Sequence, residues 1–256
     1  MSTVSAKVFY FSPPPDGSPP FTTINADPRT GQPGRNWVAE EHTVEVENVR
    51  GREENYTLDT SGFQFLKKAA HHKDFLDDSG IKAEYYPESA ALLKEVTGAT
   101  RVELFDHTVR RHRPGDASTE TNESKRQPVS QVHVDQTPES ATARVFRHVP
   151  AEAEELVKKR FQIINLWRPI SYPALDYPLA LCDYRTVDTA KDLVPVALIY
   201  PPPQRKDEVV LIKCYDSTAD KNVATFTPHT GFKDPTAPKG APLRESVELR
   251  ALVFYD

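Results

Sequence analysis

The 256-residue sequence is poor in the features that mark several large classes of protein. It has only two cysteines, Cys182 and Cys214, which excludes a disulfide framework and favours a reducing compartment. No apolar run approaches the about 18 residues that a membrane-spanning helix needs. The first residues, MSTVSAKVFYFSPPP, lack a basic segment followed by a sustained apolar one, so no secretory signal is expected. We therefore expect a cytoplasmic protein without a membrane partner.

The sequence also lacks a strong excess of charge of one sign. Its net charge is −5 at pH 7, which gives no electrostatic reason to expect a nucleic acid or an anionic membrane as partner. Hydrophobic residues make up 38% and charged residues 27%, as in ordinary globular proteins. Proline is the residue in excess, since 23 prolines are present. So many prolines favour short strands and irregular loops over long helix bundles.

Composition along the chain predicts an N-terminal arm and one large domain. Residues 12–36 are rich in Pro, Gly and Asp, so we expect an extended arm over 1–37 and a single domain over 38–256. Residues 111–130 carry almost no apolar side chains, which predicts a mobile loop. This loop lies directly before the segment 130–138, so it is either a lid over a site there or a flexible surface loop.

Periodicity and turn residues predict a mainly β fold with supporting helices. Helices are expected over 63–78, 87–98 and 149–161. Strands are expected over 38–51, 100–110, 162–170, 195–201, 208–216, 222–232 and 246–256. Helices early in the chain and many short strands later favour a β-barrel or sandwich supported by helices.

The segment SQVHVDQTP, residues 130–138, places His133 and Asp135 two apart between valines. About one such His-x-acid pair is expected by chance, and His72 and Asp74 form a second one. Side chains two apart point about 200° from one another on a helix but share one face on a strand. Because His72 and Asp74 lie in a predicted helix, we expect them on a solvated face. The pair in the strand context is the candidate pair of metal ligands.

A mononuclear iron(II) site needs a third ligand, the usual set being two histidines and one carboxylate. His229, in TFTPHTGF, is the candidate because of the strand that follows it, although the other histidines remain alternatives. In that strand Arg244, Ser246, Glu248 and Arg250 alternate with apolar residues. Two interpretations of this polar face are possible. In an exposed sheet it meets water, whereas in a barrel whose outside is covered by helices it lines the interior. There an Arg-x-Ser pair suits the distal carboxylate of a dicarboxylate.

The order H-x-D, distal His and R-x-S resembles the iron(II)/2-oxoglutarate-dependent dioxygenases. More narrowly, HVDQT, INLWRPI, YPLALCD, PHTGF and PLRESVELRALVFYD resemble the fungal asaB hydroxylase/desaturase family, over roughly residue 38 to the C-terminus. The resemblance implies a double-stranded β-helix, that is a jelly-roll or cupin-like barrel. It implies Fe(II), 2-oxoglutarate and dioxygen as cofactor and cosubstrates, and a small-molecule substrate. That substrate would be a secondary-metabolite intermediate, with terpenoids and meroterpenoids among the candidates, whose unactivated C–H bond is hydroxylated, desaturated or converted by oxygen insertion such as endoperoxidation.

Carried over position by position, the resemblance implies that His133, Asp135 and His229 bind the iron. It also implies a cosubstrate site, formed by Arg244, Ser246, Gln131 and Asn165. Fifteen positions separate His229 from Arg244, a long gap for the superfamily, so Arg250 is an alternative carboxylate partner.

Two other functions stay open at this point. One is a cupin-type metal enzyme that does not use 2-oxoglutarate, and the other is a non-catalytic small-molecule-binding barrel in which the histidines and the aspartate only satisfy one another. Production of succinate would separate the first alternative from a dioxygenase, and metal analysis the second. A homodimer is the default expectation for the oligomeric state.

Overall fold

The computed structural model describes residues 3–12, 14–17, 22–26, 33–35, 37–115, 126–189, 198–200 and 208–255. Its strands are β1 (Thr3–Ser12), β2 (Thr22–Ala26), β3 (Pro33–Arg35), β4 (Val38–Asn48), β5 (Phe63–Lys67), β6 (Arg101–Arg111), β7 (Phe161–Pro169), β8 (Leu179–Cys182), β9 (Leu198–Tyr200), β10 (Glu208–Asp216), β11 (His229–Gly231) and β12 (Glu245–Phe254). Its helices are α1 (Asp78–Gly80), α2 (Tyr86–Thr97), α3 (Pro138–His148) and α4 (Ala153–Leu156), with the short helical turns η1 (Glu53–Asn55), η2 (Ile81–Tyr85) and η4 (Tyr184–Thr186).

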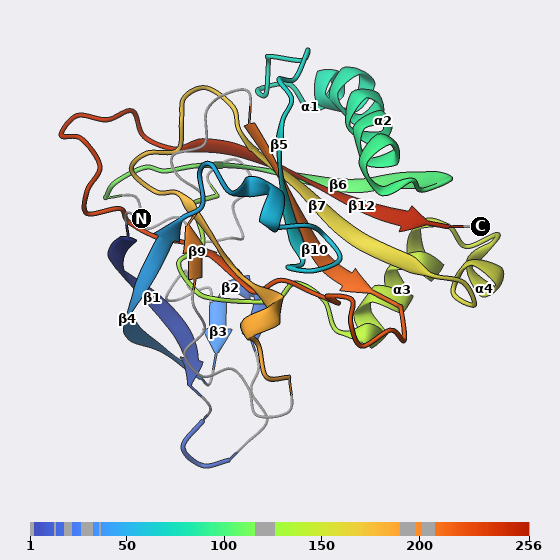
Figure 1. Cartoon of the computed structure of the whole chain (residues 1–256), viewed down its shortest axis with the longest axis horizontal. Coiled ribbons are helices and arrows are strands. Elements are labelled where there is room, and N and C mark those ends of the chain that lie inside the picture. The colour runs from blue at the N-terminus through green and yellow to red at the C-terminus, as the bar shows by residue number, and fades with distance from the viewer. Residues whose placement is uncertain are drawn as a thin grey trace.

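Two five-stranded sheets form the body of the protein (Figure 1). The first has the order β5-β10-β7-β12-β6, and the second has the order β1-β4-β9-β8-β11. Among the described strands all pairings within these two sheets are antiparallel except that of β4 with β9. The predicted fold class, mainly β with supporting helices, is confirmed.

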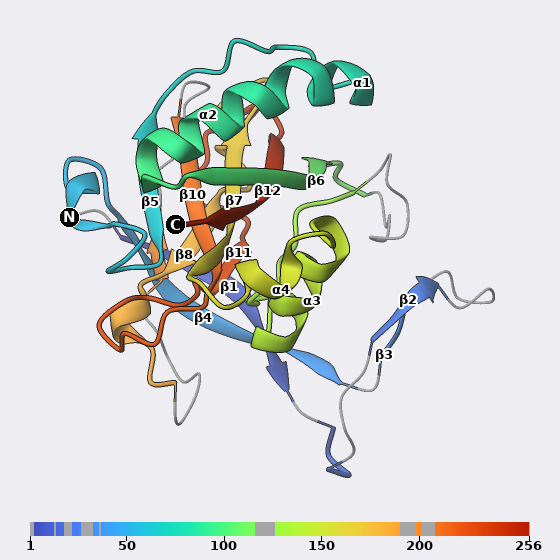
Figure 2. The ribbon, with the colours of Figure 1, turned by 90° about the vertical axis from the view of Figure 1, so that its right-hand side faces the viewer.

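Helix α2 covers the outer face of the first sheet (Figure 2). Its Leu92 and Leu93 pack with Leu166 of β7 and Leu249 of β12 in one buried cluster. The apolar face of β12 is therefore turned toward the helix. Its polar face, which carries Ser246, is turned toward the second sheet, as the alternation along the strand predicts. No helix of the described residues has both the length and the apolar character needed to span a bilayer.

The inner faces of the two sheets pack against one another. Trp167 of β7, Ile212 of β10 and Leu181 of β8 belong to one buried cluster. Helices α3 and α4 cover one end of the first sheet, where Val145 and Phe254 share another cluster. The polar face of β12 therefore looks into the space between the sheets, where a site can be shielded from water.

The helix predicted over 63–78 is wrong. Its first residues form β5, which pairs with β10, and the helical segment begins only at Asp78. The Asp77 side chain accepts hydrogen bonds from two backbone N–H groups of that first turn. Phe63 and Phe65 fit a two-residue period as well as a helical one, and the hydrogen bonds to β10 select the strand.

The other helix predictions have mixed outcomes. The helix over 87–98 is confirmed as α2, and Gly98 ends it in the left-handed conformation, with φ 69° and its N–H bonded to the Lys94 carbonyl. The helix over 149–161 is reduced to the four residues of α4. Helix α3 was not predicted, although Thr137 and Ser140 form a capping box at its start.

Most predicted strands are present. The structure confirms those over 38–51, 100–110, 162–170, 208–216 and 246–256 as β4, β6, β7, β10 and β12. The strand over 222–232 is reduced to β11, the one over 195–201 is described only over β9, and β8 was not predicted.

The first residues of the chain take part in the second sheet. Strand β1 pairs with β4 along its whole length, and its Ala6 and Val8 are buried. A separate arm over 1–37 and a single domain over 38–256 stay a prediction.

The loop over 111–130 is described only at its two ends, since 116–125 lies outside the described residues. These ends are joined by a bond of 3.1 Å from the Arg111 N–H to the Arg126 carbonyl. The Gln127 side chain also bonds both backbone groups of Arg113 at 2.9 Å. The role of the loop as a lid stays a prediction.

A buried cluster of charges lies on β10, away from the space between the sheets. The fully buried Lys213 ammonium donates to Asp59 and to Asp216, each at 2.8 Å. Arg160 also donates to Asp216, at 2.7 Å. Burial would raise the pKa of Asp216, but Arg160 and Lys213 hold it below its usual value. The charged form of the Asp216 carboxylate therefore balances these cations and stabilises the folded protein.

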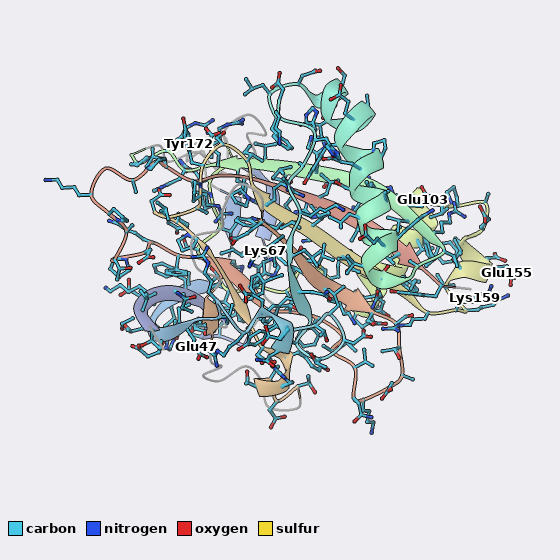
Figure 3. The ribbon with its side chains drawn as sticks, turned by 45° about the horizontal axis from the view of Figure 1, so that its top comes forward. Glu47, Lys67, Glu103, Glu155, Lys159 and Tyr172 are labelled. Carbon is cyan, nitrogen blue, oxygen red and sulfur yellow. The ribbon has the colours of Figure 1, made fainter. Side chains whose placement is uncertain are left out.

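We expect Asp216→Ala to lower the free energy of unfolding by about 3 kcal/mol, because the buried Lys213 ammonium loses one of its two carboxylate partners and keeps only Asp59. Urea denaturation of wild type and variant measures the loss. The control is Glu155→Ala, which removes an exposed ion pair with Lys158 and is expected to change nothing measurable. Glu155 lies at the surface (Figure 3). A loss for Asp216→Ala as small as the one for Glu155→Ala would contradict a structural role for the cluster.

The same cluster predicts how stability depends on acid. The folded-state pKa of Asp216 is lowered, so below the unfolded value of about 3.9 the unfolded chain binds more protons than the folded one. The contribution of Asp216 is thus present above about pH 4 and is lost as pH falls through the folded-state pKa. We expect the stability difference between wild type and Asp216→Ala to shrink as the pH falls below about 4. Urea midpoints across this range measure it, and a constant difference would contradict the pKa shift.

Candidate metal centre

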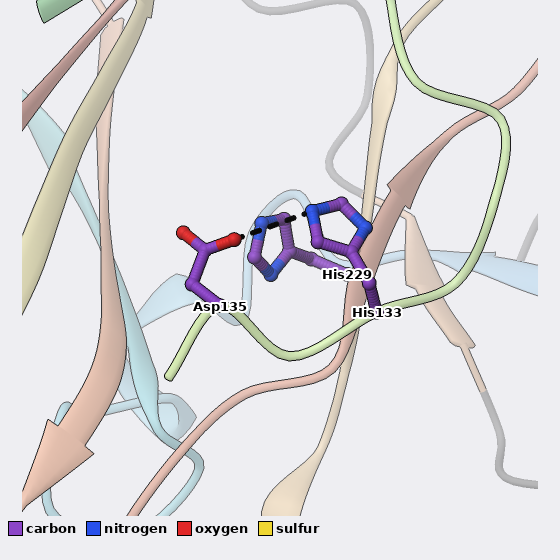
Figure 4. Close-up of side chains that lie close together, drawn as sticks. All are labelled: His133, Asp135 and His229. Carbon is purple, nitrogen blue, oxygen red and sulfur yellow. Dashed lines mark ion pairs between the residues drawn. The ribbon is translucent and has the colours of Figure 1, made fainter. Parts of the chain in front are cut away.

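His133, Asp135 and His229 meet at one point between the two sheets (Figure 4). One ligand atom from each side chain lies within 4.8 Å of the others. His133 and His229 pair as an isolated antiparallel bridge, with N–H to carbonyl distances of 3.1 and 3.0 Å, and their ring centroids are 4.5 Å apart. Nε2 of His133 lies 3.4 Å from Oδ1 of Asp135. The extended segment 131–135 thus presents two ligands to a histidine far along the chain.

Backbone carbonyls orient both imidazole rings. Nδ1 of His133 lies 2.8 Å from the Gln131 carbonyl, and Nδ1 of His229 lies 3.0 Å from the Thr227 carbonyl. A carbonyl only accepts, so each Nδ1 carries the proton and each Nε2 is left as the ligand atom. This is the usual outer-shell arrangement around metal-binding histidines.

The carboxylate of Asp135 is held in its ionised form. Burial would raise its pKa, but the imidazoles of His133 and His229 beside it keep it well below the usual range. Burial also lowers the pKa of both imidazoles, and the carboxylate outweighs this at His133, whose pKa is raised. At His229 burial and the neighbouring His133 prevail, and the pKa is lowered. Two imidazoles and one carboxylate that approach from one side are a ligand set typical of iron(II), and they leave its other coordination positions open.

Arg244 is buried and lies against Gly231, which follows His229 by two residues in β11. Its Nε and Nη2 donate to Oγ of Ser246 at 3.2 and 3.1 Å, and its Nη1 donates to the Tyr177 carbonyl at 3.0 Å. The guanidinium lies over the Trp167 ring, 5.0 Å from its centroid. A Cβ at Gly231 would come within 3.0 Å of Nη1, so glycine in the PHTGF motif leaves the room that the guanidinium occupies.

The Arg244 cation has no carboxylate partner among the described residues. Burial, and then the nearby Arg110, lower the pKa of Arg244 to about 10. Three of its five N–H groups are bonded, which leaves one on Nη1 and one on Nη2 for an anion. A buried cation with free donors fits the distal carboxylate of 2-oxoglutarate.

Arg250, the alternative carboxylate partner, is already paired. Its Nη1 donates to Asp106 at 2.9 Å and its Nη2 donates to Glu248 at 2.6 Å. Burial would lower its pKa, but the carboxylates of Glu248, Asp135 and Asp106 outweigh this and raise it. Arg244 is therefore the better candidate for the cosubstrate.

The two other predicted cosubstrate residues have different positions. The Gln131 side chain is half-buried and makes no hydrogen bond within the described part of the chain, so its amide is available. The Asn165 amide donates to Oδ2 of Asp135 at 2.7 Å, so it contacts the metal centre itself. Sequence reasoning missed Cys214, whose thiol lies 3.5 Å from the same oxygen, and Tyr177. Neither position follows from local spacing.

The second His-x-Asp pair is not on a solvated helix face, as expected, but in an irregular segment. His72 is buried, and its Nδ1 lies 2.9 Å from a Glu84 carboxylate oxygen. Its Nε2 bonds the Asp74 carbonyl, so both ring nitrogens have partners. Of the described residues only the triad brings three ligating side chains together.

Comparison with known proteins identifies the family. A family model described as an oxidoreductase/YMDC permease-like domain matches residues 8–206 and 199–254. The Fe(II)/2-oxoglutarate-dependent dioxygenase nvfI of Aspergillus novofumigatus is 31% identical over 95% of this chain and 94% of its own length. The hydroxylase/desaturase efuI of Hormonema carpetanum is 34% identical over 83% of each chain. This chain belongs to the fungal Fe(II)/2-oxoglutarate-dependent dioxygenases.

A solved structure supports the same family. The iron and alpha-ketoglutarate-dependent endoperoxidase NvfI superposes with a TM-score of 0.84 at 28% identity, over 99% of this chain and 98% of the other. The predicted double-stranded β-helix is thus confirmed. As a member of this family the dioxygenase uses Fe(II), 2-oxoglutarate and dioxygen, and the non-catalytic barrel and the cupin without 2-oxoglutarate are set aside.

Proposed function

We propose that this dioxygenase couples oxidative decarboxylation of 2-oxoglutarate to oxidation of an unactivated C–H bond in a small secondary-metabolite intermediate. The observation that carries the proposal is the His133–Asp135–His229 triad, with ligand atoms within 4.8 Å, beside the buried Arg244 that lacks a carboxylate partner. Relatives named as hydroxylase/desaturase and as endoperoxidase make hydroxylation, desaturation and oxygen insertion the candidate outcomes.

The proposal gives each residue a defined task. The triad holds iron(II), which when bound supplies the activation of dioxygen. Arg244 and Ser246 hold the distal carboxylate of 2-oxoglutarate, and the free amide of Gln131 is placed to donate to the cosubstrate. Trp167 forms an apolar wall beside Arg244, which keeps water from the anchored carboxylate. These residues thus hold iron(II) and 2-oxoglutarate in fixed positions before the substrate binds.

Anaerobic titration tests this function directly. Addition of Fe(II) and 2-oxoglutarate to the metal-free protein is expected to produce the visible metal-to-ligand charge-transfer band of the chelate. Exposure to air is then expected to yield succinate in proportion to the 2-oxoglutarate consumed. Absence of both the band and succinate would contradict the proposal. Oxidation of a substrate without formation of succinate would favour a metal enzyme that does not use 2-oxoglutarate.

A cytoplasmic location and a homodimer remain predictions of the sequence. Size-exclusion chromatography with light scattering tests the second, and a mass near 28.8 kDa would contradict it.

A further inference from the structure

The two oxygens of Asp135 have different surroundings. Oδ1 faces His133, whose Nε2 is 3.4 Å away, on the side where the two rings meet (Figure 4). Oδ2 points away from the rings and accepts a hydrogen bond of 2.7 Å from Nδ2 of Asn165. The Cys214 thiol lies 3.5 Å from the same oxygen and adds a weaker donor. Only Oδ1 is thus presented to the metal side.

Asn165 is held firmly in place. It lies in the middle of β7, opposite Ile212 of β10 on one side and Arg250 of β12 on the other. Its exposed fraction is 0%. A side chain in a central strand, paired on both sides, cannot follow a carboxylate that moves, so it acts as a fixed donor.

Fold stability alone does not explain an asparagine at this position. Its Oδ1 is buried and has no hydrogen-bond partner among the residues that the structure describes, which generally costs about 1–3 kcal/mol. An apolar residue of similar size would avoid that cost. Exchanging the amide oxygen and nitrogen would place two acceptors against one another at Asp135, so the direction of the bond is set by the carboxylate.

We infer that Asn165 is a positioning residue that reserves Oδ2 of Asp135, so that this aspartate binds the metal through Oδ1 alone. This inference rests on the proposed iron site. A carboxylate with both oxygens free can occupy two positions at a metal, and the Asn165 bond removes one of them. A position is thereby kept open for 2-oxoglutarate or dioxygen. Loss of the bond weakens metal binding because the ligand is no longer pre-oriented.

The test compares two amides on the same strand. Asn165→Leu removes the donor and keeps the branched shape and the number of heavy atoms of the side chain. Its matched control is Gln162→Met, because the buried Gln162 amide donates in the same way, at 2.7 Å, to Asp216, a carboxylate outside the triad. Calorimetric titration with Co(II), a redox-stable substitute for Fe(II), measures affinity in the metal-free proteins. The visible spectrum of the Co(II) forms reports a changed coordination.

We expect Co(II) affinity to fall by about 10- to 100-fold in Asn165→Leu and to stay at the wild-type value in Gln162→Met. The Co(II) spectrum should change only in the first. Unchanged affinity and spectrum in Asn165→Leu would overturn the positioning role while leaving the iron site intact. An equal loss in both variants would also overturn it, because a general loss of stability would then be the cause. A wild-type protein that does not bind Co(II) would overturn the metal centre as well. Asn165→Ala replaces the leucine variant if that one does not fold.

Discussion

Replacing Asp135 with alanine is expected to abolish turnover. The substitution removes the anionic ligand of the triad and leaves two imidazoles, so the site loses both charge and one of three ligand atoms. The loss should exceed the about 100-fold that removal of an outer-shell partner causes. Succinate formation under saturating Fe(II) and 2-oxoglutarate measures turnover, and calorimetry with Co(II) measures binding. Both are expected to fall together.

The chain contains a natural control for this experiment. Asp74 follows His72 with the same spacing, but both ring nitrogens of His72 are bonded, and Asp74 bonds the Leu76 N–H at 2.9 Å. Asp74→Ala should therefore leave turnover and Co(II) affinity unchanged. Wild-type-like succinate formation in Asp135→Ala would contradict the ligand assignment.

Replacing Arg244 with methionine is expected to raise the KM for 2-oxoglutarate by roughly 30- to 3,000-fold. Loss of a buried charged partner costs about 2–5 kcal/mol, and about 1.4 kcal/mol corresponds to a factor of ten. The anchored carboxylate lies away from the reacting end of the cosubstrate, so kcat at saturation should change less than KM. Initial rates of succinate formation across a range of 2-oxoglutarate concentrations separate the two constants.

Arg250→Met is the matched comparison. Arg250 is already paired with Asp106 and Glu248, so its loss should change the KM for 2-oxoglutarate by a few-fold at most. Thermal unfolding of metal-free Arg244→Met should stay close to wild type, because the lost hydrogen bonds are offset by removal of an uncompensated buried charge. A larger rise in KM for Arg250→Met than for Arg244→Met would assign the carboxylate to Arg250 instead.

Local patterns were sufficient where one period of the sequence dominates. The alternation along β12 placed Ser246 on the inner face, and Gly98 marked the end of α2, because strand pleat and left-handed backbone are set by neighbouring residues. The same patterns gave the wrong prediction over 63–78, where the apolar residues fit the two-residue period of a strand as well as the period of a helix. There the hydrogen bonds of β5 to β10, more than a hundred residues away, decided the outcome.

The sequence by itself determined which side chains are able to bind iron and the cosubstrate, since residue type and two-residue spacing are local properties. Only the tertiary structure decided that His229 reaches Asp135, that Arg244 rather than Arg250 lacks a carboxylate partner, and that Asn165 bonds a ligand oxygen. These outcomes depend on which strands become neighbours. Strand pairing is settled by burial and hydrogen bonding across the whole chain, which spacing along the sequence does not record.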